Sequence, residues 1–97
     1  MPELSVVAII TAQHGKAEIV REALSALVAP SRDEEGCLEY DLFESDIADT
    51  FVTVEKWRGP EDLQAHMASP HIAQTFAVAG EALAGAPVIH SLRRVEV

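Results

Sequence analysis

The chain has 97 residues, a length that suits one small domain with a core near the lower limit for a stable monomer. Apolar residues make up 48% of it, which excludes a disordered chain. Sixteen acidic residues against seven basic ones give a formal net charge of −9, and this balance argues against nucleic acid or an anionic membrane as a partner, because both require a basic patch.

Other compositional features bear on where the protein works. The single cysteine, Cys37, cannot form an internal disulfide, and the N-terminus shows no secretory signal pattern. The longest nearly apolar run, residues 6–10, is far too short to cross a bilayer. We therefore expect a cytoplasmic protein that forms one domain over residues 1–97.

The first half of the chain predicts three strands and one helix. Residues 4–12 (LSVVAIITA) are typical of a strand with apolar side chains on both faces. Residues 16–28 predict an amphipathic helix, which a charged loop around Pro30 follows. Residues 37–44 and 50–57 predict two strands joined as a hairpin.

Two helix starts lie close together in the second half. Gly59 suits an N-cap and Pro60 the first helical position, where a missing N–H costs nothing. Ser69-Pro70 repeats this signal, so we expect the helical region to be broken there, with the second piece ending near Gly85. Residues 87–97 predict the last strand.

This order of strand, helix, two strands, helix and strand is typical of the ferredoxin-like split βαβ pattern. That is an α+β fold in which helices cover one face of an antiparallel four-stranded sheet. A sheet whose free face meets water should alternate apolar and polar residues, and residues 4–12 do not. The chain has no spare element to cover the second face, so we expect a homodimer formed through it.

Two stretches of the sequence resemble a known family. They are Gly36-Cys37-Leu38-Glu39-Tyr40 and residues 51–71, FVTVEKWRGPEDLQAHMASPH. With the order of elements, they resemble the antibiotic biosynthesis monooxygenase (ABM) family, which includes small quinol monooxygenases. The resemblance extends over nearly the whole chain. It implies a dimeric α+β barrel and the oxygenation of a hydroquinone or polyphenol by dioxygen without a cofactor.

Two histidines are candidate catalytic residues. His66 lies at the border of its helix's apolar stripe, where it could accept a proton from a phenol or simply pack. His71 follows Ser69-Pro70 and could hydrogen-bond a ligand or face solvent. The resemblance favours catalysis by His66, because a histidine recurs at this place in the family. The i,i+5 spacing across a helix break argues against a shared metal, since zinc helices use i,i+4.

Glu55 and Trp57 are predicted to share one face of their strand. Trp57 is the only tryptophan and could offer a flat wall and an N–H donor to a planar aromatic ligand, or it could close the core. Glu55 near the core needs a partner, which Arg93 or Arg94 could supply from the last strand.

Tyr40, Met67 and Phe76 are the remaining candidate substrate contacts. Tyr40, which is predicted to share a strand face with Leu38, could hydrogen-bond a quinol oxygen or pack with its hydroxyl at the rim. Met67 and Phe76 suit either the core or a pocket wall. Cys37 has no evident basic cluster around it, which favours an inert thiol.

Cofactor signatures are missing from the sequence, so we expect no flavin, haem or metal. It contains no glycine-rich phosphate loop and no dinucleotide fingerprint. Haem-degrading proteins of the same superfamily rely on an asparagine and a histidine ligand, whereas this chain has no asparagine and carries Phe76 at the ligand position. The favoured interpretation is a cofactor-independent monooxygenase. The alternative is a non-enzymatic dimeric domain that binds a small molecule or serves in a stress response.

Overall fold

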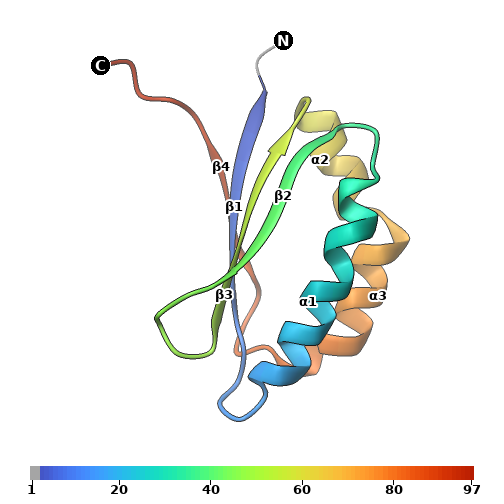
Figure 1. Ribbon diagram of the computed structural model, residues 1–97, viewed down its shortest axis with the longest axis vertical. Coiled ribbons are helices and arrows are strands. Elements are labelled where there is room, and N and C mark those ends of the chain that lie inside the picture. Colours follow the sequence, from blue (N-terminus) through green and yellow to red (C-terminus); the bar gives the residue numbers. More distant parts are fainter. Residues whose placement is uncertain (1–2) are drawn as a thin grey trace.

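The computed structural model describes residues 3–97, whose helices cover one face of an antiparallel sheet (Figure 1). In chain order the elements are β1 (Leu4–Thr11), α1 (Ala17–Arg32), β2 (Cys37–Glu44), β3 (Thr50–Trp57), α2 (Pro60–Met67), α3 (Pro70–Ala79), a 3-10 turn (Gly80–Ala82) and β4 (Val88–Leu92). The strand order is β2-β3-β1-β4, and every neighbouring pair is antiparallel. The predicted α+β ferredoxin-like fold with a broken second helix is confirmed.

The core lies between the sheet and the helices. Alternate residues of β1 and β3 are buried, because successive side chains of a strand point to opposite faces. The largest contributors to this core are Val6, Ile10, Val20, Leu24, Leu27, Tyr40, Phe51 and Trp57. Thr53 and Glu55 are buried in the same row of β3, between Phe51 and Trp57. The inner face of the sheet therefore presents polar atoms to the helices.

The opposite face of the sheet, here called the outer face, is apolar as well. In the register of the strands Val7 pairs with Val54, and Ile9 pairs with Val52. The apolar residues of the outer face are Val7, Ile9, Phe43, Val52, Val54 and Val88, and the register places Asp41, Lys56 and His90 on the same face. Phe43 is 52% exposed and Val54 is 40% exposed, and within residues 3–97 no helix covers them. The prediction of a first strand with apolar residues on both faces is confirmed.

α1 runs beyond its predicted end. It continues through Pro30 to Arg32, and the backbone N–H of Asp33 still donates to the carbonyl of Ala29 at 3.1 Å. Proline removes its own backbone donor and crowds the carbonyl four residues earlier, but in the last turn it leaves the hydrogen bond from Asp33 to Ala29 in place. Glu34, in the loop that follows this longer helix, lies at the junction of α2 and α3.

Two strands also differ from their predictions. The register of β2 shifts between Cys37 and Glu39, so Leu38 is exposed and does not share the buried face of Tyr40. The expected common face of Leu38 and Tyr40 is therefore wrong, because a bulge changes the alternation at that point. β4 ends at Leu92 instead of continuing to residue 97.

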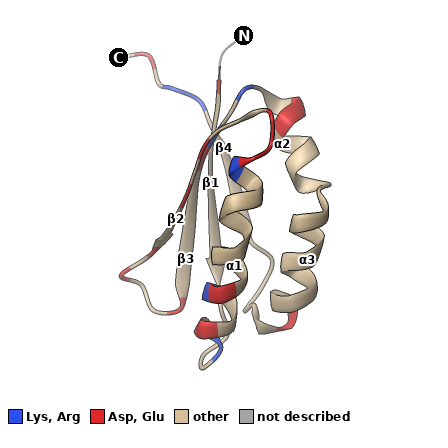
Figure 2. Cartoon of the chain, turned by 45° about the vertical axis from the view of Figure 1, so that its right-hand side comes forward, with Lys and Arg blue, Asp and Glu red and all other residues tan. Residues whose placement is uncertain are grey.

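Acidic residues lie at both ends of the molecule (Figure 2), and at one end the loop between α1 and β2 meets the start of α2. Glu61 and Asp62 lie in the first turn of α2, where negative side chains complement the positive end of the helix. No helix within residues 3–97 combines the length and apolar character that a membrane span requires.

Candidate active site

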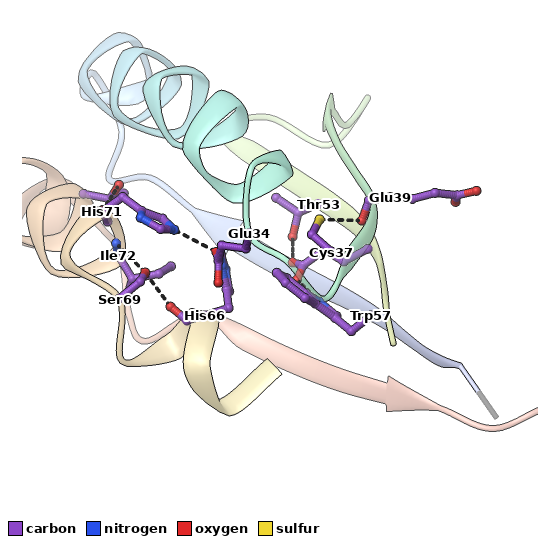
Figure 3. A network of polar contacts seen from close by, with 11 residues as sticks. Glu34, Cys37, Glu39, Thr53, Trp57, His66, Ser69, His71 and Ile72 are labelled. Atoms are coloured by element: carbon purple, nitrogen blue, oxygen red, sulfur yellow. Dashed lines mark hydrogen bonds and ion pairs between the residues drawn. The ribbon is translucent and has the colours of Figure 1, made fainter. Parts of the chain in front are cut away.

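One carboxylate bridges two imidazoles at the corner between α2 and α3 (Figure 3). Oε2 of Glu34 lies 2.6 Å from Nδ1 of His66 and 2.7 Å from Nε2 of His71. A carboxylate only accepts hydrogen bonds, so each of these ring nitrogens donates an N–H to it. In the neutral imidazole the lone pair then belongs to the other nitrogen, which is Nε2 in His66.

Three segments bring these side chains together. Glu34 lies in the loop after α1, His66 in the last turn of α2 and His71 in the first turn of α3. Ser69 holds the corner between the two helices. Its hydroxyl donates to the carbonyl of His66 at 2.6 Å and accepts the backbone N–H of Ile72 at 3.3 Å. The side chain that caps α3 thereby also fixes the end of α2.

The loop that carries Glu34 packs tightly on α2. The backbone N–H of Cys37 donates to the carbonyl of Glu34 at 3.0 Å and closes the loop. A Cβ atom at Gly36 would lie 2.1 Å from Cγ of Asp62, so only glycine allows the loop to approach the helix this closely. A side chain at position 36 would displace the loop, and Glu34 with it.

His66 is a core residue, with 2% of its surface exposed. Its ring packs against Trp57, with centroids 4.7 Å apart, and against Tyr40 at 5.5 Å. The interpretation of His66 as a boundary residue is therefore wrong. The stripe on α2 alone did not indicate the depth of burial, because α3 and the loop after α1 close over the ring.

Both carboxylate oxygens of Glu55 accept hydrogen bonds from side chains of its own strand. One carboxylate oxygen accepts the indole N–H of Trp57 at 2.9 Å, and the other accepts the hydroxyl of Thr53 at 2.6 Å. The expected ion pair with Arg93 or Arg94 is not among the contacts of residues 3–97, because both arginines lie beyond the end of β4 and are exposed. The indole N–H of Trp57 is engaged by Glu55 and is not free for a ligand.

A narrow apolar cavity lies next to His66, between the sheet and the helices. Its volume is about 40 Å³. The lining residues are Ala8, Ile10, Leu24, Leu27, Tyr40, Thr53, Glu55, His66, Met67, Ile72, Phe76, Pro87 and Ile89. A larger, open depression of about 350 Å³ lies along β2 and contains no histidine. We place the candidate site in the smaller cavity, because only there does a possible base meet an apolar wall.

The environment suppresses the ionisation of Tyr40, which lines the cavity, and of Cys37, which lines the open depression along β2. Burial, reinforced by the carboxylate of Glu55, raises the pKa of Tyr40 well above its ordinary value. Burial, followed by the nearby carboxylates of Glu34 and Glu55, raises the pKa of Cys37 to about 11. A neutral Tyr40 can serve as a hydrogen-bond donor, and Cys37 is not poised as a nucleophile.

Comparison with known proteins identifies the family. The model of the antibiotic biosynthesis monooxygenase (ABM) family matches residues 4–78. The chain belongs to this family. In sequence, the ABM chain is 42% identical to YcnE of Bacillus subtilis over 72 residues, which cover 73% of this chain and 74% of YcnE.

Similarity to Rv0793 of Mycobacterium tuberculosis is found in both sequence and structure. The two sequences are 39% identical over 64 residues, which cover 66% of this chain and 63%, less than two thirds, of Rv0793. The names of Rv0793 and YcnE propose a monooxygenase activity. The solved structure of Rv0793 superposes with a TM-score of 0.88 at 29% identity, over 99% of this chain and 98% of that one.

A second solved structure of similar shape is PA3566 of Pseudomonas aeruginosa. It superposes with a TM-score of 0.88 at 38% identity, over 99% of this chain and 97% of that one. The resemblance of the sequence to the ABM family is confirmed by these matches and by the family model.

The structure of the ABM chain separates the candidate residues into two groups. Tyr40, Glu55, His66, Met67 and Phe76 line the cavity. The other two candidates do not line it: Trp57 lies behind the ring of His66, and His71 lies on the far side of Glu34.

Glu34 is the site residue that the sequence did not reveal. It stands among four consecutive charged residues, 32–35, in a segment that predicts only a solvated loop. The i,i+5 spacing, which argued against a shared metal, does not keep the two imidazoles apart. The corner at Ser69 turns both rings toward Glu34.

Proposed function

We propose that this ABM chain is a cofactor-independent monooxygenase that acts on a hydroquinone or a related polyphenol. The observation that supports it best is the hydrogen bond from Nδ1 of His66 to Glu34, in a histidine that also lines an apolar cavity. Nε2 of His66 has no hydrogen-bond partner among residues 3–97. The family description and the names of the relatives support the reaction class.

In this proposal His66 is the general base. Its Nε2 lone pair takes the proton of a substrate hydroxyl, and the ring becomes a cation whose Nδ1–H is already held by the carboxylate of Glu34. The carboxylate thus stabilises the charge that forms during proton transfer, as an acidic partner does for a catalytic histidine. His71 holds the same oxygen from the other side and keeps Glu34 in place.

The substrate supplies the electrons. Loss of one hydroxyl proton gives a phenolate that can itself reduce dioxygen, after which a C–O bond forms between the ring and one oxygen atom. The O–O bond then breaks, and the second oxygen atom leaves as water with two hydrogen atoms of the substrate. Hydroquinone and dioxygen thus give hydroxyquinone and water. The protein contributes the base, the orientation of the ring and a pocket that excludes water.

The size of the cavity favours a small substrate. Pockets that enclose ligands usually measure about 300–1,000 Å³, so a cavity of about 40 Å³ has to widen before a ring can enter. Met67 lines the cavity yet is 42% exposed, and Phe76 is only half-buried beside it. Movement of these two side chains would admit a single-ring hydroquinone more readily than a polycyclic phenol.

A homodimer through the outer face is part of the proposal. The apolar side chains on that face are exposed to water in a single chain, and burying them against a second copy would be favourable. Pairing of two such faces would bury β1 and β3 on both sides and leave the helices and the candidate site on the outside of the dimer.

The test is oxygen uptake with a panel of single-ring and polycyclic hydroquinones, corrected for autoxidation, followed by product analysis after reaction under ¹⁸O₂. We expect uptake above that of unfolded protein and the incorporation of label from dioxygen into the ring. No uptake with any member of the panel, together with saturable binding of one of them, would favour the non-enzymatic binding domain instead.

A further inference from the structure

We propose that Glu34, His66 and His71 form a binding site for a divalent transition-metal ion, best matched by zinc, and that the bound ion prevents His66 from acting as a base. Two ring nitrogens and a carboxylate oxygen face one another here, and all three lie within 4.8 Å. Two histidines and one carboxylate are a donor set of zinc sites that keep one position open. The binding does not rest on the proposed function; only the loss of the base does.

The geometry requires an adjustment of the three ligand atoms, which lie within 4.8 Å of one another. Zinc bonds to nitrogen and oxygen of about 2.0–2.2 Å place neighbouring ligand atoms of a tetrahedron about 3.3 Å apart. The carboxylate oxygen lies 2.6 and 2.7 Å from the two nitrogens, which are the distances of N–H hydrogen bonds. Replacing the two protons by one ion therefore moves the oxygen away from each nitrogen by roughly 0.6 Å.

The parts of the site that have to move are the less buried ones. His66 is packed in the core, whereas 17% of the Glu34 side chain and 21% of the His71 side chain are exposed. Glu34 lies in a loop, and His71 lies at a helix start. Solvent reaches both of these residues, so water can fill the open coordination position.

The donor types favour a transition ion. Imidazole nitrogen suits zinc and similar ions, whereas magnesium and calcium prefer sites built from oxygen alone.

Binding of the ion changes the role of His66. A neutral imidazole has one lone pair, and coordination through Nδ1 uses it, so Nε2 has to carry the proton. A ring in that state donates a hydrogen bond toward the cavity and cannot accept the proton of a substrate. His66 therefore cannot bind zinc through Nδ1 and accept a substrate proton at Nε2 at the same time.

The first measurement is calorimetric titration of the chelator-treated full chain with zinc. We expect saturable binding of a single ion per chain, and no comparable binding of magnesium. His71→Ala and Glu34→Gln should each weaken the affinity by about tenfold or more, since the loss of even an outer-shell group costs about 10- to 100-fold. The matched controls, His14→Ala and Glu35→Gln, remove exposed groups of the same types and should change nothing.

The second measurement is a two-bond ¹⁵N–¹H correlation spectrum of the histidine rings. Zinc should move the proton of His66 from Nδ1 to Nε2, a change that a merely structural contact would not produce. Absence of zinc binding, or binding that His71→Ala and Glu34→Gln leave unchanged, would overturn the site. Binding that leaves Nε2 unprotonated would overturn the exclusion of the base. Zinc binding without oxygen uptake would count against the proposed function alone.

Discussion

Oε2 of Glu34 lies 2.6 Å from Nδ1 of His66, although the two residues are 32 positions apart in the chain. A side chain in a loop therefore sets the tautomer and the orientation of an imidazole in the core. The function of His66 depends on how this loop is held, and the predictions below follow from that dependence.

Glu34→Gln should lower kcat/KM for oxygen uptake by about ten- to a hundredfold. The amide oxygen can still accept the N–H of His66 but lacks the charge that stabilises the imidazolium, and a hydrogen bond to a charged group contributes about 1.5–3 kcal/mol. Glu35→Gln is the control, because the side chain of Glu35 is 90% exposed. Equal losses in both variants would show that only the overall charge matters.

His66→Asn should lower turnover by about a hundredfold or more, the scale of a lost general base. The Asn amide can donate to Glu34 in place of Nδ1–H but offers no basic nitrogen to the cavity. Because His66 is buried, this variant should also lose about 1–3 kcal/mol of stability in urea unfolding. His14→Asn, in the exposed turn before α1, is the control. Unchanged turnover in folded His66→Asn would remove His66 from the mechanism.

Cys37 should react slowly with thiol reagents. Its pKa of about 11, against an ordinary value of 9.0, leaves about a hundredfold less thiolate at pH 8 than in an unhindered cysteine. The alkylation rate by iodoacetamide should therefore rise about tenfold per pH unit between pH 8 and 10. A rate that levels off near pH 8.5 would contradict the raised pKa.

The same shift has a consequence for stability. The folded chain keeps the Cys37 proton that the unfolded chain releases, so the contribution is complete below pH 9 and is lost as the pH rises toward 11. Tyr40, whose pKa is also raised, acts in the same direction above pH 10. Alkaline unfolding followed with Tyr40→Phe should begin at higher pH than in the wild type.

Val52→Lys should convert the expected dimer into a monomer. It places a charge between Ile9 and Phe43 on the outer face, where pairing would bury it among apolar side chains, and should weaken association by about a hundredfold or more. Val78→Lys is the matched control, because Val78 is exposed on α3, on the opposite side of the molecule. Light scattering that finds the wild type monomeric at micromolar concentration would remove the dimer.

The sequence predicted the elements that repeat a simple period. The alternation in residues 50–57 placed Glu55 and Trp57 on one buried face, and Ser69-Pro70 marked the break between the helices, as the structure confirms. These features depend on neighbours in the chain, and local patterns report them well.

The parts that the sequence did not predict depend on contacts between distant segments. The burial of His66 results from packing by three elements, and the partnership of Glu55 with Trp57 arises from side-chain geometry within β3. The sequence predicted Glu34 to be a solvated loop residue, whereas in the structure it contacts the imidazoles of His66 and His71. Hydrophobic periodicity and composition do not indicate which side chains from distant segments come into contact.

The break between α2 and α3 at Ser69 determines how the rings of His66 and His71 are oriented relative to each other. In one continuous helix, His66 and His71 would be rotated about 140° from each other around the axis, and no single oxygen could reach both rings. Because α2 and α3 are separate, residues can be added at their outer ends without turning either ring. One residue inserted at the corner would rotate His71 by about 100° relative to Glu34. Changes in length should therefore be tolerated at the outer ends of α2 and α3 but not at the corner between them.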